Sequence, residues 1–158
     1  MKKLTLTTEK VLAAYRTLST AKYTKLDDAD KIKAWKIARK LKPVATKFEE
    51  DSQDAAEKMK PSEDFDEQLR KAQEYERITR QPDFDAQKLP IGVAEYNQFL
   101  DKFHAYNKLV NDAVKDFADK EVELEIEPLT EDAFGKLMAS NEEWTMEQAV
   151  VMGDIVCE

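Results

Sequence analysis

Apolar residues recur at helical spacing along most of the chain, and this pattern predicts a mainly helical fold. Thr8 is expected to cap a first helix near 8–22. A second helix is predicted to begin at Asp27 or Asp28, and Pro43 should kink or split it. The apolar stripe of this second helix consists of Ala34, Ile37, Ala38, Leu41, Ala45 and Phe48.

Two further helices are predicted on either side of a loop at 81–92 that contains prolines and a glycine. The helix before the loop begins near Asp64 and has a thin apolar face, so we expect it to pack peripherally. The helix after it, about 93–120, carries one stripe of large side chains and is expected to dominate the core. That stripe comprises Tyr96, Phe99, Leu100, Phe103, Tyr106, Val110, Ala113, Val114 and Phe117.

Two short segments alternate apolar and polar residues, as half-buried strands do. Residues 3–7 and 122–127 are too short to be stable alone, so we expect them to pair antiparallel, with Lys2 and Lys3 near the glutamates. Thr130 and Thr145 should cap two more helices. The sequence therefore predicts an α+β fold in the weak sense: a single domain over 1–158, with four to six helices and a small two-stranded antiparallel sheet.

Charge is unevenly distributed along the chain. The net charge is −8, but residues 119–158 carry −10 and the rest carries +2. This acidic C-terminal region is a candidate partner surface. Residues 31–48 hold seven basic and no acidic side chains, a pattern typical of nucleic-acid binding. However, Lys33, Lys36, Lys40 and Lys47 are expected opposite the apolar stripe, where a solvated face is needed, and no aromatics interleave to stack bases. Nucleic acid is therefore not an expected partner.

Candidate catalytic chemistry is sparse. His104 is the only histidine and Cys157 the only cysteine, so neither a nucleophilic pair nor a zinc site is supported. No glycine-rich phosphate loop or calcium loop occurs. We assign no catalytic, cofactor-binding or metal-binding residues, and expect a protein that is not an enzyme. An enzyme that uses carboxylates alone to hold a metal is the remaining catalytic alternative.

Targeting signals are also missing from the pattern. No apolar run approaches the ~20 residues that cross a bilayer, and the start lacks the apolar core of a signal peptide. A single cysteine rules out an intramolecular disulfide. These features predict a cytoplasmic protein without membrane contact.

The order of elements resembles a family of small uncharacterised proteins of tailed phages and prophages. The resemblance is carried by Met1-Lys-Lys-Leu-Thr-Leu-Thr at the start, a lysine-rich helical middle, and Glu121-Val-Glu-Leu-Glu-Ile-Glu127 before a terminal helical piece. It implies phage or prophage origin and a non-enzymatic role, and it transfers no functional residues.

The favoured hypothesis is a non-enzymatic protein that binds another protein, either a phage structural protein or a host protein, in assembly or host interference. The alternative is an acidic mimic of nucleic acid that inhibits a host or defence protein. Association of the chain with copies of itself, as a homo-oligomer, is a further alternative. Tyr15, Trp35 and Trp144 are each expected to be partly buried in the protein's own core. The candidate partner-binding residues are Glu123, Glu125, Glu127, Trp144, Met146 and Met152.

Overall fold

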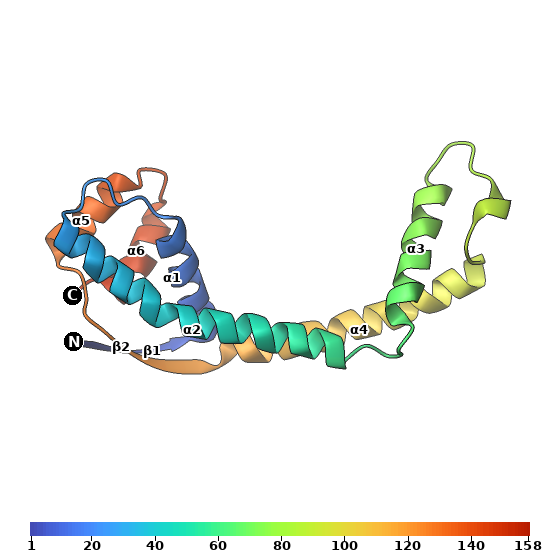
Figure 1. Ribbon diagram of the computed structural model, residues 1–158, viewed down its shortest axis with the longest axis horizontal. Coiled ribbons are helices and arrows are strands. Elements are labelled where there is room, and N and C mark those ends of the chain that lie inside the picture. Colours follow the sequence, from blue (N-terminus) through green and yellow to red (C-terminus); the bar gives the residue numbers. More distant parts are fainter. The chain divides into compact units, whose positions relative to one another are not determined.

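The computed structural model describes all residues, 1–158, and confirms a mainly helical fold with one small sheet (Figure 1). None of its helices has the length and apolar composition needed to cross a membrane. The elements are β1 (Lys2–Thr7), α1 (Thr8–Thr20), α2 (Asp28–Lys58), α3 (Phe65–Thr79), the short 3-10 helix η1 (Ala86–Lys88), α4 (Val93–Asp119), β2 (Glu121–Ile126), α5 (Glu131–Ser140) and α6 (Met146–Val156).

The sheet pairs the two segments predicted from their alternation. β1 and β2 are antiparallel, with Lys2 opposite Ile126 and Thr7 opposite Glu121. Side chains directly opposite one another share a face of the sheet, so Leu4 and Leu124 together pack against the hydrophobic core. The strand pairing is thus confirmed.

Threonines begin three of the helices. Thr130 and Thr145 cap α5 and α6 as predicted, and Thr145 forms a capping box with Gln148. The cap of α1 is Thr7, whose hydroxyl oxygen accepts from the Lys10 amide, so the assignment of Thr8 was wrong. Thr8 is buried, and its hydroxyl instead donates to the Lys120 carbonyl at 2.8 Å, next to the first residue of β2.

Helix α2 runs without a break through Pro43, so the prediction of a split is wrong. Proline removes one N–H from the helical ladder, which deprives the carbonyl four residues earlier of its usual partner. Here that residue is Arg39, and both it and Pro43 are exposed. Water can therefore satisfy the freed carbonyl, and the helix continues.

The chain forms two compact units. The first comprises residues 1–51 and 116–158. Its core draws on both strands, on α1, on the first half of α2, and on α5 and α6, with a further contribution from the segment after β2. Its most completely buried members include Val11, Ile37, Leu41, Ile126, Leu129, Leu137, Met152 and Val156.

The second unit, residues 52–115, has its own aromatic cluster. Phe65 is almost fully buried and lies 4.8 Å from the Tyr106 ring, centroid to centroid. The Tyr106 hydroxyl donates to the Ala56 carbonyl at 2.8 Å. Helix α3 therefore anchors this unit through Phe65, but, as expected from its thin apolar face, it contributes no residue to the main hydrophobic core.

Helix α4 does not dominate the core. Among the nine residues of its predicted stripe only Phe99 is buried, and the others are half-buried. A stripe shows which side of a helix turns inward, but the depth of burial depends on how many elements cover that side. The main core instead belongs to the first unit.

Candidate docking groove

The glutamates of β2 lie on the solvent face of the sheet. Glu121, Glu123 and Glu125 are exposed, whereas Val122, Leu124 and Ile126 turn toward the core. In the register of the sheet, Glu123 and Glu125 face Thr5 and Lys3 of β1. The charged side chains on the outer face of this short sheet are therefore mostly acidic.

Of the two N-terminal lysines, only Lys3 lies beside these glutamates. The Lys2 ammonium donates to the carbonyls of Asp154 and Cys157, each at 2.7 Å. These carbonyls belong to the C-terminal end of α6, where a cation is favoured by the helix dipole. The expectation that Lys2 would face the glutamates is thus corrected.

The outer edge of β2 has free main-chain groups. The Thr8 amide donates to the Lys120 carbonyl, so these two residues form a hydrogen-bonded pair of the ladder. The next pair, Thr7 and Glu121, therefore has no hydrogen bonds between its members. Such pairs alternate along an antiparallel ladder, so Glu123 and Glu125 also point their N–H and C=O groups away from β1. No other protein group bonds to them, because the sheet ends at β2.

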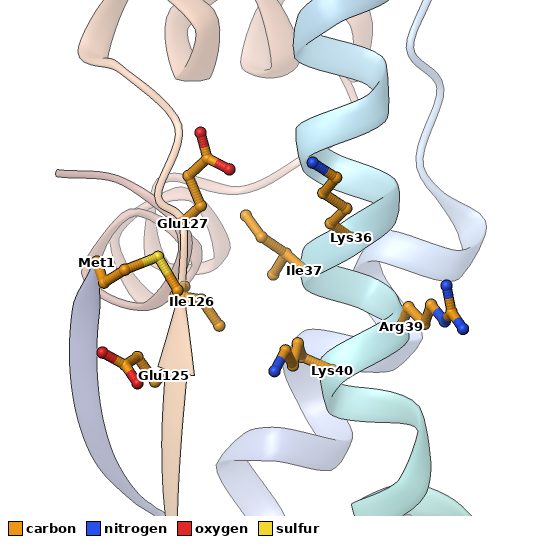
Figure 2. A pocket seen from close by; sticks show the side chains of 8 residues that line it. All are labelled: Met1, Lys36, Ile37, Arg39, Lys40, Glu125, Ile126 and Glu127. Atoms are coloured by element: carbon orange, nitrogen blue, oxygen red, sulfur yellow. The ribbon is translucent and has the colours of Figure 1, made fainter.

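A hollow of about 420 Å³ lies between the end of β2 and α2. Figure 2 shows Ile37 and Lys40 of α2 reaching toward the strand, while Arg39 points away from it. Ile126 lies on the opposite side, with Glu125, Glu127 and Met1 around it. The floor of this hollow is apolar, and its rim carries both signs of charge.

A second hollow of about 420 Å³ follows the beginning of β2. Val44 and Phe48 of α2 line it, together with Phe117 and Val122. Its polar lining includes Lys47 and Glu123. The two hollows border the same pair of elements, and we call them together the α2–β2 groove. Its lining residues are those of the first hollow, Met1, Lys36, Ile37, Arg39, Lys40, Glu125, Ile126 and Glu127, and those of the second, Thr8, Val44, Lys47, Phe48, Asp51, Phe117, Lys120, Glu121, Val122 and Glu123.

The lysines of α2 line this groove. They were predicted on the face opposite the apolar stripe, but Lys36, Lys40 and Lys47 flank the stripe on the side that faces β2. Lys33 forms an ion pair with Glu127, with 3.6 Å between the charged atoms. A hydrogen bond at 2.9 Å to Asp51 raises the pKa of Lys47. The groove therefore runs between a basic helix and an acidic strand.

Sequence reasoning missed most of the groove. Ile37 and Phe48 were identified only as core positions of a helix, Phe117 only as part of another stripe, and Val44 was not singled out at all. The sequence did contain one signal of the groove: the lysines of α2 flank its apolar stripe, as a helical-wheel projection shows. The facing strand could not be deduced from α2 alone.

Trp35 is more exposed than predicted. Its side chain is 57% exposed, and the Arg39 guanidinium stacks over the ring at 5.2 Å from its centroid. Ile32, one turn earlier, is also exposed. Tyr15 and Trp144 were predicted to be partly buried in the core, and both are.

The C-terminal candidates for partner binding separate into different environments. Met146 is 78% exposed, and Trp144 packs partly against the core. Met152 is only 2% exposed and belongs to the core of the first unit, so it is not available to a partner and its assignment is corrected. None of the three lines the groove, whereas Glu123, Glu125 and Glu127 all do.

The remaining reactive side chains are dispersed. His104 is exposed on α4, and Cys157 is a buried free thiol at the end of α6. No group of three or more histidine, cysteine, aspartate or glutamate side chains is arranged to hold a metal ion. The groove offers hydrogen-bonding edges, apolar hollows and fixed charges, which are means of binding a partner.

Comparison with known proteins gives no match: no family model, no curated protein and no solved structure is significantly similar to this chain. Function is therefore inferred from the groove itself. The phage resemblance stays a prediction.

Proposed function

We propose that this is a non-enzymatic protein that binds another protein through the α2–β2 groove. The observation that carries the proposal is the free outer edge of β2, which borders two apolar hollows. Strand edges with free main-chain groups are sites at which other chains attach. A groove that combines such an edge with apolar hollows gives a partner both main-chain and side-chain contacts.

The arrangement of residues supports an interface. Protein interfaces combine an apolar centre with a polar rim. In the groove, the half-buried Val44 and Phe48 supply the apolar surface that a partner can reach, whereas Ile37 is a core residue that forms part of the floor. Lysines line one side and glutamates the other. Charges of opposite sign at a rim contribute to partner choice and to the rate of association more than to affinity.

The nature of the partner is part of the same proposal. Phage or prophage origin, with a role in assembly or in host interference, is inferred from the sequence resemblance. The acidic mimic finds less support, because the β2 glutamates lie beside the α2 lysines, and Lys33 pairs with Glu127. A surface that imitates a phosphate backbone requires a continuous run of negative charge.

The test is capture of a partner by tagged protein from bacterial lysate, with and without phage infection. Val44→Trp places a large side chain in the second hollow, at a residue that is only partly buried. Lys42→Trp adds the same ring at an exposed residue of α2 outside both hollows, and so serves as the matched control. A stoichiometric partner should be retained by the wild type and the control and lost by Val44→Trp.

Two outcomes of this capture experiment would contradict the proposal. If Val44→Trp folds with wild-type circular dichroism and still captures the same partner, docking in the groove is wrong. If no stoichiometric partner is captured from either lysate, the protein-binding role itself loses its support. Washing at high salt distinguishes two kinds of contact. Apolar contacts in the hollows should persist, whereas ion pairs at the rim should be weakened by screening.

A further inference from the structure

We infer that the partner binds as an extended segment that adds a third strand to the outer edge of β2. This inference rests on the proposed protein-binding function and specifies the kind of partner. It is carried by the free main-chain groups of Glu123 and Glu125, together with the two hollows beside them.

The main-chain groups of β2 have the spacing that an added strand requires. Glu123 and Glu125 are two residues apart, which is the spacing at which a neighbouring strand makes successive hydrogen bonds. A sheet of two strands is marginal by itself and gains stability from a third. An added strand would therefore satisfy four main-chain groups that have no partner within the protein.

The hollows match the side chains of an added strand. Alternate residues of a strand point to opposite faces of the sheet. Those on the core face would enter the hollows, one near Ile37 and Ile126 and the other near Val44 and Phe48. Those on the outer face would lie beside the carboxylates of Glu123 and Glu125.

Strand β1 shows which residues suit this environment. On its side of β2 it presents Leu4 and Leu6 to the core, and Lys3 and Thr5 to the glutamates. The same acidic side chains would be neighbours of the added strand. The partner segment should therefore alternate aliphatic residues with lysine or threonine.

A second copy of this chain fits the edge poorly. Pairing two β2 strands edge to edge would bring the glutamates of one copy beside those of the other. Like charges on neighbouring strands are destabilising, and charged side chains on an edge strand are a common means of preventing such self-association. A foreign segment with basic residues fits the charge better.

The probe is a capped synthetic peptide of about eight residues, a typical strand length, that alternates valine with lysine or threonine. Binding is measured by calorimetry, and the contact is located by amide hydrogen exchange. We expect saturable binding that slows exchange of the Glu123 and Glu125 amides at least about tenfold, because each gains a hydrogen bond. A peptide methylated on alternate nitrogens, on the edge that would face β2, should not bind.

A variant tests the same edge from the protein side. Glu123→Pro removes an N–H that points away from β1, and proline is tolerated on edge strands at such positions. It should weaken binding of the peptide at least about tenfold. Glu123→Thr removes the same charge but keeps the N–H, and should weaken binding by no more than about threefold.

Two results with the peptide would overturn the added strand. One is equal binding of the methylated and unmethylated peptides, which remains decisive even if Glu123→Pro does not fold. The other is the absence of any saturable binding of the alternating peptide. If a partner captured from lysate is lost by Val44→Trp but retained by folded Glu123→Pro, docking in the groove stands and the added strand is wrong. If it is retained by both folded variants, the groove itself is wrong.

Discussion

The side chain of Asn141 forms hydrogen bonds with both the N–H and the C=O group of Lys22. Its amide oxygen accepts from the Lys22 N–H at 2.7 Å, and its amide nitrogen donates to the Lys22 carbonyl at 2.8 Å. The same nitrogen donates to the Leu137 carbonyl, also at 2.8 Å. Asn141 is 1% exposed, so these bonds fix the connection after α1 to the end of α5 without help from water.

Replacing Asn141 should therefore be costly. Asn141→Leu keeps a side chain of similar size but leaves the Lys22 N–H and C=O without a partner. We expect a loss of about 2–4 kcal/mol in the free energy of unfolding, measured by urea denaturation. Asn111→Leu, at an exposed site on α4, should change it by less than about 0.5 kcal/mol. Equal effects of the two substitutions would contradict the structural role of Asn141.

Lys2 should contribute to stability through the end of α6. Lys2→Met keeps most of the side-chain length and removes the ammonium that bonds the Asp154 and Cys157 carbonyls. A loss of about 1–2 kcal/mol in the free energy of unfolding is expected, from two hydrogen bonds and the helix dipole. Lys3→Met, on the exposed face of β1, should have a smaller effect. The role of Lys2 is wrong if Lys3→Met is as destabilising as Lys2→Met.

Tyr23 should make stability depend on pH in the alkaline range. Burial raises the pKa of its phenol, whose hydroxyl donates to the Leu18 carbonyl. Above pH ~10 the unfolded chain loses this proton while the folded chain keeps it. The free energy of unfolding should therefore fall as pH rises beyond that value. Tyr23→Phe should show a shallower fall in urea titrations between about pH 9 and 11, and an unchanged slope would contradict this cause.

The prediction of a single domain can be tested through the aromatic cluster of the second unit. Both tryptophans lie in the first unit, whereas Phe65 lies in the second. Because α2 and α4 run without a break through both units, we expect one cooperative transition. Phe65→Ala should cost about 3–5 kcal/mol and shift tryptophan fluorescence and circular dichroism together. Separate transitions would show that the units unfold independently.

The sequence predicted those parts of the fold that depend on local patterns. The strict alternation in 122–127 identified β2, and two short strands with no other partner had to pair with each other. Thr130 and Thr145 were found as caps because a threonine before an apolar helical stripe has a direct physical role. Thr7 was missed in favour of Thr8, since neighbouring threonines give the same signal and only the bond to Lys120 distinguishes them.

Other features depend on which elements meet, and no local pattern contains that information. The apolar stripe correctly identified the inward-facing side of α4. Its residues are nevertheless covered less completely than those of the first unit's core. Met152 was taken for a surface residue because α6 is apolar over most of its circumference, with exposed Val150 and Val151 beside it. The groove required knowing that β2 ends the sheet and that the lysines of α2 face it.

The most direct test of the central claim, that the outer edge of β2 is open to a partner, is amide hydrogen exchange in the free protein. The N–H groups of Val122 and Leu124 point toward β1, and those of Glu123 and Glu125 point outward. We predict that the Glu123 and Glu125 amides exchange at least about tenfold faster than the Val122 and Leu124 amides. Equal protection of all four would contradict the account, because it would mean that the edge is already covered.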